Sequence, residues 1–590
     1  MSISVRVGKE CRRMRKDSCR AGMSFVLSLA FSAFYGFIIY KAIGFLYAIG
    51  DDVIMRDIAS GAFTGRPDGH LIFVKYALGF ILSRFYLLNP QVDWYGFFMA
   101  GTLFLALAVI LYRGLSAKKE ILWKGLYLVL TLSLFTLVMV FHAAQFEWTV
   151  SAAMLGASGL YLYITKTESG KWQCILEEVL IWALLFLTFC IRTDVFFMVL
   201  PGFGISFLWK FVKGKKGVIK LCFLELVLPA AVFVTAGAVM LMESAAYKGE
   251  GWEEFRKFQE ARTQVYDYSG VPSYEADPAF FDELGLSEHE ARNLRHYALY
   301  LIEGMDWELM EAFCEESQRQ NNMETGFLER IKGGISLALR QFVQKEYFPA
   351  SLPMLLLLAG VLVLAFLYEK RALLPLALFW MAEGVLWLAL GYVGRLPERV
   401  AFSLHLTALL AMAAYFYRLY EKEERGISLK IKAVTVSGFL VLILAGAAFQ
   451  WKASADSNRM KAARDGNYQL FKDACKEEPE KLFFVETFMA EPIGGAAVTG
   501  RGNFTQNNCI TLGDWYSTSP LDQERMKNLG IDDVEETIVS NPDAFLVVRD
   551  VEDPGFLGSY FAYKYPEYSL ELREVKMIED RCYYLYQIQR

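Results

Sequence analysis

Long apolar runs recur along most of this 590-residue sequence, and they constrain its fold more than any other feature. Each run is long enough to cross a hydrocarbon core about 30 Å thick as a helix. Hydrophobic residues make up 55% of the chain, which exceeds the usual level of soluble proteins. We therefore predict an α-helical polytopic membrane protein with about eleven transmembrane helices, at residues 22–47, 93–112, 122–141, 147–165, 175–191, 195–211, 219–243, 351–368, 372–390, 398–417 and 431–450.

The distribution of positive charge predicts how the chain is oriented, because short cytoplasmic loops are enriched in Lys and Arg. With the basic segment 1–21 placed in the cytoplasm, all the next cytoplasmic loops are basic: 112–124, 165–172, 209–220, 368–372 and 417–432. We therefore expect a multi-pass protein of the plasma (inner) membrane with a cytoplasmic N-terminus and an extracytoplasmic C-terminal domain. The net charge of only −5 gives no indication of nucleic acid as a partner.

The segment 71–88 is apolar but carries Lys75 and Arg84. If it crossed the membrane, every later loop would change sides and the basic loops would lie outside. Helices with basic residues also settle at the membrane interface. We predict a helix that lies in, or dips into, the outer interface.

Two large hydrophilic pieces then fall on the same outer side. Residues 244–350 form a predicted helical loop, in which "LSEHE" is typical of a capped helix start, and residues 451–590 form a predicted α/β domain. The membrane part comprises a first module, 22–243, with an acidic first outer loop at 48–92, and a second module, 351–450. Cys475, Cys509 and Cys582 lie in the last domain; they could include one disulfide if it is extracytoplasmic, or be free buried thiols.

Polar residues collect at the predicted outer ends of the helices. The candidates are Asp51, Asp52, Asp68, His70, Glu147, Arg192, Asp194, Arg395 and Arg399. Charges near hydrocarbon are costly unless they are paired or hydrated, so acids and bases from separate loops predict one polar cavity. A carboxylate can deprotonate an acceptor hydroxyl, and arginines can hold a phosphate. These groups suit group transfer from a lipid-linked phosphate, and a nucleotide donor is not expected on this side.

Simpler roles are open for the same residues. Asp51 and Asp52 could cap a helix, since acids favour helix N-termini. Arg192 and Asp194 could pair with each other, while Arg395 and Arg399 could contact lipid headgroups.

The arrangement resembles the GT-C class of membrane glycosyltransferases, which use polyprenyl-phosphate-linked sugars and include protein O-mannosyltransferases. An acidic pair, Asp51-Asp52, follows the first transmembrane helix, interfacial helices come next, and a soluble outer domain ends the chain. The sequence is also similar to uncharacterised bacterial membrane proteins with a "DD…SG.(Y/F)TG.PD.H" loop and a "WYG" helix start, present here as Trp94-Tyr95-Gly96. The resemblance covers about residues 20–450.

The resemblance implies that Asp51 or Asp52, with Asp52 preferred, is the catalytic base or orients the acceptor. It also implies that this pair could bind a divalent cation. The expected reaction moves a sugar from a polyprenyl-phosphate carrier to an envelope polymer, a lipid or a protein, with inversion at the anomeric carbon and membrane lipids around the enzyme. No other cofactor is expected.

Two other functions are consistent with the sequence. A polymerase or ligase for lipid-linked oligosaccharides would also have many transmembrane helices and a large outer loop. A transporter or flippase would not be an enzyme, and for that function we would expect broken helices and inverted repeats along the sequence.

Overall fold

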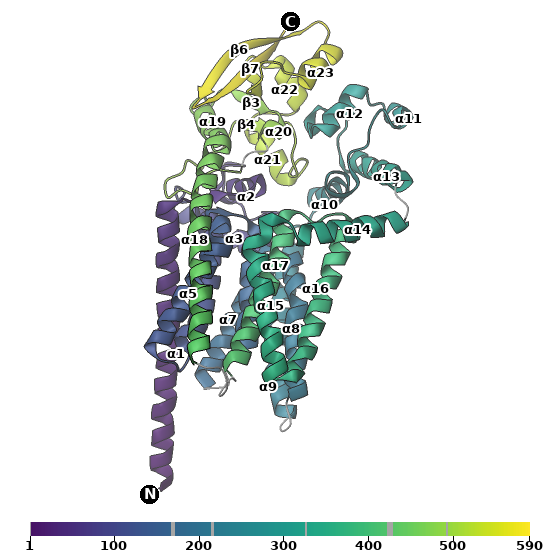
Figure 1. Ribbon diagram of the computed structural model, residues 1–590. Helices are drawn as coiled ribbons and strands as arrows, with labels where there is room; N and C mark the ends of the chain where they lie inside the picture. The colour runs from purple at the N-terminus through teal and green to yellow at the C-terminus, as the bar shows by residue number, and fades with distance from the viewer. Residues whose placement is uncertain (1, 167–170, 214–217, 325–326, 422–428, 491–493) are drawn as a thin grey trace.

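The fold is a bundle of long helices with a soluble cap at one end, and the cap consists of the helical loop and the C-terminal domain (Figure 1). The computed structural model describes residues 2–166, 171–213, 218–324, 327–421, 429–490 and 494–590. Parts of three basic loops, 165–172, 209–220 and 417–432, fall outside these residues. The sequence predicts a helical polytopic membrane protein with a C-terminal α/β domain, and this fold class is confirmed.

Eight helices among the described residues are long and apolar enough to cross a membrane. They lie within α1 (Ser2–Ala42), α4 (Trp94–Ser116), α5 (Ile121–Ala144), α7 (Lys171–Ile191), α9 (Val218–Ala246), α15 (Phe348–Tyr368), α16 (Leu373–Val393) and α17 (Glu398–Glu421). The other three predicted transmembrane segments coincide with α6 (Trp148–Thr165), α8 (Thr193–Lys213) and α18 (Leu429–Asp465).

Helix α6 lies at the centre of the bundle, and all of its residues are buried. Its sequence, "WTVSAAMLGASGLYLYIT", is rich in Ala, Gly and Ser, and small residues let neighbouring helices approach closely in a membrane. A Cβ added at Gly156 would lie 3.1 Å from a methyl carbon of Val199 on α8. The middle of α6 is therefore packed closely against α8.

Two short helices connect α1 to α4: α2 (Gly50–Ser60) and α3 (Tyr76–Leu88). The 13 residues of α3 extend about 20 Å at 1.5 Å per residue, which is too short to cross the hydrocarbon core. The chain before Tyr76 is not helical, so segment 71–88 has the length of an interfacial helix.

The loop 244–350 is helical. It contains α10 (Glu250–Thr263), the π-helical turn η1 (Gln264–Ser269), α11 (Pro278–Glu283), α12 (Glu288–Arg295), η2 (Leu299–Leu301), α13 (Trp307–Glu324), α14 (Phe327–Phe342) and η3 (Lys345–Tyr347), and η4 (Lys370–Ala372) follows later. Ser287 and Glu290 form the capping box of α12 that "LSEHE" predicts. Helix α14 runs across the ends of the long helices (Figure 1).

The C-terminal domain is built on a five-stranded sheet in the order β4-β3-β5-β7-β6. Strands β3 (Leu482–Val485), β4 (Cys509–Thr511) and β5 (Ala544–Arg549) are parallel, and β6 (Ser569–Ile578) and β7 (Arg581–Gln589) form an antiparallel hairpin beside them. The helices of this domain are α19 (Asn467–Cys475), α20 (Thr487–Ala490), α21 (Pro520–Asn528), α22 (Val534–Ser540) and α23 (Phe556–Lys564).

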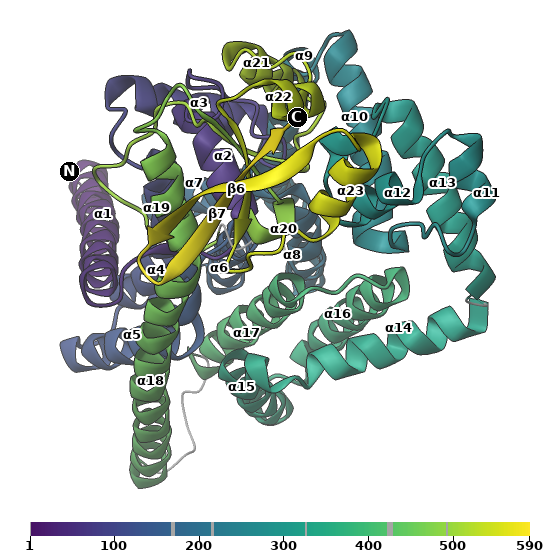
Figure 2. The same cartoon turned by 90° about the horizontal axis from the view of Figure 1, so that it is seen from above.

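The C-terminal domain and the helices α10–α13 lie at the same end of the bundle, opposite the N-terminus (Figure 1). Seen from above, the sheet lies over α2, with α10–α13 beside it (Figure 2). Both large hydrophilic pieces therefore cover the end of the bundle that carries the acidic pair. Which side of the membrane this end faces stays a prediction from the charge distribution.

Candidate functional site

A two-residue parallel strand pair brings the acidic pair next to Glu147. Strand β1 (Leu46–Tyr47) pairs with β2 (Gln145–Phe146), and the backbone N–H of Ala48 donates to the carbonyl of Phe146 at 3.0 Å. Because the two strands run in the same direction, the chain leaves both at the same end. Helix α2 then begins at Gly50 and α6 at Trp148, so both acidic segments lie at neighbouring helix starts.

Asp52 is completely buried, and protein groups hold both of its carboxylate oxygens. The hydroxyl of Tyr95 donates to Oδ1 at 2.6 Å, and the backbone N–H of Trp148 donates to Oδ2 at 3.4 Å. Burial raises the pKa of Asp52 well above its ordinary value, although these two hydrogen bonds act in the opposite direction. Asp52 thus ties the first turn of α2 to the starts of α4 and α6.

Asp51 is only partly buried, and its surroundings are different. The positive charges near it belong to Arg399, Arg262 and Arg192, which come from α17, α10 and the turn between α7 and α8. Burial raises the pKa of Asp51, and these arginines reduce the shift. Asp51 is therefore the carboxylate of the acidic pair that faces the arginines.

Glu147 and Arg399 form a further ion pair at this place. The Nε of Arg399 lies 3.3 Å from Oε1 of Glu147, and the Glu147 side chain is 10% exposed. Burial raises the pKa of Glu147 to about 7, and the charge of Arg399 limits the shift. A carboxylate with this pKa changes its charge near neutral pH, which is the range in which general acids and bases work best.

Arg192 lies over the aromatic face of Trp148, with the guanidinium carbon 4.0 Å from the ring centroid. Its NH2 is 3.3 Å from Asp194, whose side chain is 77% exposed. Burial lowers the pKa of Arg192, and Asp194 partly offsets this. Arg192 thus keeps its contact with exposed Asp194 while its guanidinium group is stacked on Trp148.

The helical loop contributes charged residues from the opposite side. Asp267 Oδ2 is 2.7 Å from NH1 of Arg395 and 4.0 Å from NH2 of Arg262. Arg262 also donates to the hydroxyl of Tyr297 at 2.8 Å. The outer loop therefore closes the cluster over the membrane helices.

The predicted site residues thus divide into two groups. Asp51, Glu147, Arg192 and Arg399 share one charged cluster, and Arg395 joins it through Asp267. Asp194 lies at its exposed edge. Asp52 lies beside the cluster, held by Tyr95 and the Trp148 N–H. The remaining candidates, Asp68 and His70, form their own contact elsewhere.

Asp68 and His70 bind each other at the end of α9. Oδ1 of Asp68 is 2.6 Å from Nδ1 of His70, and Nε2 of His70 is 3.2 Å from the carbonyl of Ala246. The imidazole also stacks on Trp252 of α10 with ring centroids 4.8 Å apart. These contacts connect the first outer loop to the helical loop, and they use both ring nitrogens.

Three residues of the site lie outside the sequence candidates: Tyr95, Arg262 and Asp267. Tyr95 belongs to the "WYG" motif in the first turn of α4, and this motif was the available signal in the sequence. Arg262 and Asp267 lie in a polar helical segment with many similar charges, so no spacing in the sequence distinguishes them from the other charged residues of that segment. Their role follows from the folding of the loop over the acidic pair.

The acidic pair does not form part of a clustered metal-ligand set. No group of three or more His, Cys, Asp or Glu suited to a metal ion occurs among the residues that the structure describes. Three arginines and the loop carboxylate Asp267 act on Asp51, a mixed set of charges unlike the all-oxygen ligand sets of hard divalent cations.

Three comparisons with known proteins give one structural likeness. No family model matches the sequence, and no curated protein matches it. The crystal structure of ArnT from Cupriavidus metallidurans in the apo state is similar over 96% of this chain and 98% of that chain, with a TM-score of 0.38 and 10% sequence identity.

Proposed function

We propose that the protein is a GT-C-type glycosyltransferase. It would move a sugar from a polyprenyl-phosphate carrier to an envelope polymer, a lipid or a protein at the outer face of the membrane. The observation that carries this proposal is the meeting of Asp51 with Glu147, Arg192 and Arg399 where the membrane helices end under the soluble cap. In this proposal the lipid-linked donor would approach the cluster from the membrane and the polar acceptor from the cap.

The proposed reaction is a single displacement. An acceptor hydroxyl attacks the anomeric carbon while Asp51 takes its proton, and the bond from that carbon to the phosphate oxygen breaks. The polyprenyl phosphate leaves with the bonding electrons, and Arg192 and Arg399 stabilise its charge through charge-assisted hydrogen bonds. Attack opposite the leaving group inverts the anomeric centre.

The family resemblance implies Asp51 or Asp52 as the base, with Asp52 preferred, but the environment of Asp52 supports a positioning role. Asp52 has no exposed surface, and Tyr95 and the Trp148 N–H hold its oxygens. Asp51 is partly exposed and faces the arginines. We therefore assign the proton transfer to Asp51 and the orientation of α2 to Asp52.

The test is turnover of radiolabelled polyprenyl-phosphate sugars by the purified protein and by its Asp51→Asn variant. We expect the variant to lose about 10²–10⁴-fold in kcat while remaining folded, as is usual for a lost general base. Glu250→Gln is the matched control, because Glu250 is also an acid in the first turn of a helix, α10. Absence of turnover by the wild type with every donor in the panel would refute the proposal, and an unchanged Asp51→Asn would refute the assignment of the base.

A further inference from the structure

A strap of residues 494–508 in the C-terminal domain contacts the chain on both sides of the acidic helix α2. Backbone hydrogen bonds attach it: Gly495 N donates to Tyr47 O at 2.7 Å, and Val498 N donates to Phe45 O at 3.0 Å. Further along the strap, Asn507 N donates to Ala62 O at 2.9 Å. These bonds lie just before the acidic pair and just after α2, so the strap holds the chain at both ends of the helix that carries the pair.

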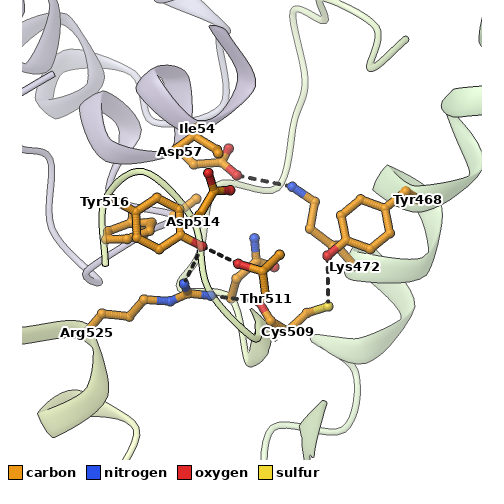
Figure 3. Close-up of a pocket in the computed structure, with 12 residues that line it drawn as sticks. Ile54, Asp57, Tyr468, Lys472, Cys509, Thr511, Asp514, Tyr516 and Arg525 are labelled. Atoms are coloured by element: carbon orange, nitrogen blue, oxygen red, sulfur yellow. Dashed lines mark hydrogen bonds and ion pairs between the residues drawn. The ribbon is translucent and has the colours of Figure 1, made fainter. Parts of the chain in front are cut away.

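A buried ion-pair cluster adds a second attachment, at the other half of α2. Oδ2 of Asp57 is 3.2 Å from Nζ of Lys472 on α19, and Oδ1 is 2.7 Å from NH2 of Arg56. That NH2 also donates to Gln469 Oε1 at 2.9 Å. Figure 3 shows Asp57 and Lys472 facing each other from α2 and the C-terminal domain. The cluster therefore joins α2 to α19 through side chains of both elements.

These charges are almost completely removed from solvent. Arg56, Asp57 and Lys472 are 3%, 6% and 5% exposed. Burial would raise the pKa of Asp57, but the charges of Arg56 and Lys472 outweigh it and hold this pKa below its ordinary value. A buried charge that loses its partner is strongly unfavourable, so the cluster tolerates little displacement of α2 from α19.

The cavity beside this cluster is small. Its volume is about 30 Å³, and Asp57, Lys472, Asn507 and Arg525 are among its lining residues. That is room for an ordered water or two and too little for a sugar. We therefore interpret the region as a structural connection and not as a substrate pocket.

The connection acts on the acidic pair through the length of α2. Asp57 follows Asp52 by five residues, which is about 7.5 Å along a helix. The first turn of α2 is held by Tyr95 and the Trp148 N–H, and its second half is held by Lys472. With both halves fixed, α2 can turn only if one of these buried contacts breaks, so the direction of Asp51 depends on the C-terminal domain.

We propose that Lys472 of the C-terminal domain is a positioning residue that fixes Asp51 through α2, so that this domain is an integral part of the catalytic unit. The inference rests on the proposed function, because Asp51 is its base. The alternative is that Lys472 only contributes stability. A positioning residue changes kcat at an unchanged amount of folded protein, whereas a purely stabilising residue changes the folded fraction.

The experiment compares Lys472→Met, Lys472→Arg and Lys564→Met in the full-length protein. Lys564 supplies the control because it also forms an ion pair inside the C-terminal domain, with Glu535 at 3.0 Å, but does not touch α2. We expect Lys472→Met to lower kcat about tenfold or more, with the donor KM within about twofold, since a small misplacement of a catalytic group has effects of this order. Lys472→Arg should recover most of kcat, and Lys564→Met should leave it unchanged.

Hydrogen exchange followed by mass spectrometry separates this inference from the proposed function. In Lys472→Met, amides in residues 50–60 should exchange faster than in the wild type, and in Lys564→Met they should not. This measurement needs no substrate, so it stands even if no donor is turned over. Unchanged exchange in residues 50–60, or an equal fall of kcat in Lys564→Met, would overturn the inference.

Discussion

The guanidinium group of Arg399 lies 3.3 Å from the carboxylate of Glu147, and this pair joins the start of α17 to the start of α6. The two residues are 252 positions apart in the sequence, and four of the described helices that are long and apolar enough to cross a membrane lie between them. Their contact brings the starts of these distant helices to the acidic pair of α2.

Activity should rise with pH through about 7, because the pKa of Glu147 is raised to about 7 and its ionised form pairs with Arg399. Glu147→Gln should remove this limb of the pH profile of kcat/KM. A limb at the same pH in Glu147→Gln would contradict the assignment.

The stability of the folded protein should also depend on the ionisation of Glu147, and the raised pKa fixes the direction in which stability changes with pH. The raised pKa means that the folded protein favours neutral Glu147, so this contribution is present below about pH 4.5 and is lost as pH rises through about 7. The melting temperature of the wild type should therefore fall relative to that of Glu147→Gln across this window. A difference in melting temperature between the two proteins that stays constant from pH 4.5 to 7 would be inconsistent with the raised pKa of Glu147.

Replacing Arg399 by Ala should raise the donor KM about 10–100-fold, since a hydrogen bond to a charged group contributes about 1.5–3 kcal/mol. Arg399→Lys should recover only part of this, because an ammonium group does not reproduce the planar fork of guanidinium. Steady-state kinetics with varied donor would measure both effects. Arg371→Ala is the control, since Arg371 is exposed at the other end of α16; an equal KM change there would argue against a specific phosphate contact.

Tyr95→Phe should lower kcat, because the Tyr95 hydroxyl holds Asp52 and with it the first turn of α2, which carries Asp51. The leftover buried oxygen should also cost about 1–3 kcal/mol in the free energy of unfolding. Steady-state kinetics and denaturant unfolding would measure the two effects. Tyr86→Phe provides the comparison, because the Tyr86 hydroxyl donates to Asp93; an equal fall of kcat in that variant would point to a general effect of phenol loss.

The buried thiols Cys475 and Cys509 should react slowly with alkylating reagents. Both are recorded as free cysteines, and the amide of Asn508 donates to the carbonyl of Cys475 at 2.8 Å, which brings the two residues together. Burial and the neighbouring Cys509 raise the pKa of Cys475, so little thiolate is available.

Peptide mass spectrometry after timed maleimide labelling of the reduced protein would test this. The partly exposed Cys582 should label first, and Cys475 and Cys509 should label only after unfolding. Labelling of Cys475 as fast as Cys582 would contradict the buried location.

The sequence by itself determined the elements of this protein. Apolar runs fix where membrane helices form, because each must satisfy its backbone hydrogen bonds internally in lipid. The same local reasoning predicts the capped start of α12, the α/β character of residues 451–590 and an interfacial helix at 71–88. It also identifies Asp51, Glu147, Arg192 and Arg399 as charges at helix ends.

Only the tertiary structure decided which of these charges meet. Asp68 and His70 look equivalent to Asp51 in sequence, yet they face α9 and α10. Asp52, and not Asp51, is the buried partner of Tyr95, because successive residues of a helix point to different sides. The strap and Lys472 fix the orientation of α2 about its axis. Contacts between residues hundreds of positions apart depend on how whole helices pack, and no local pattern of residues carries that information.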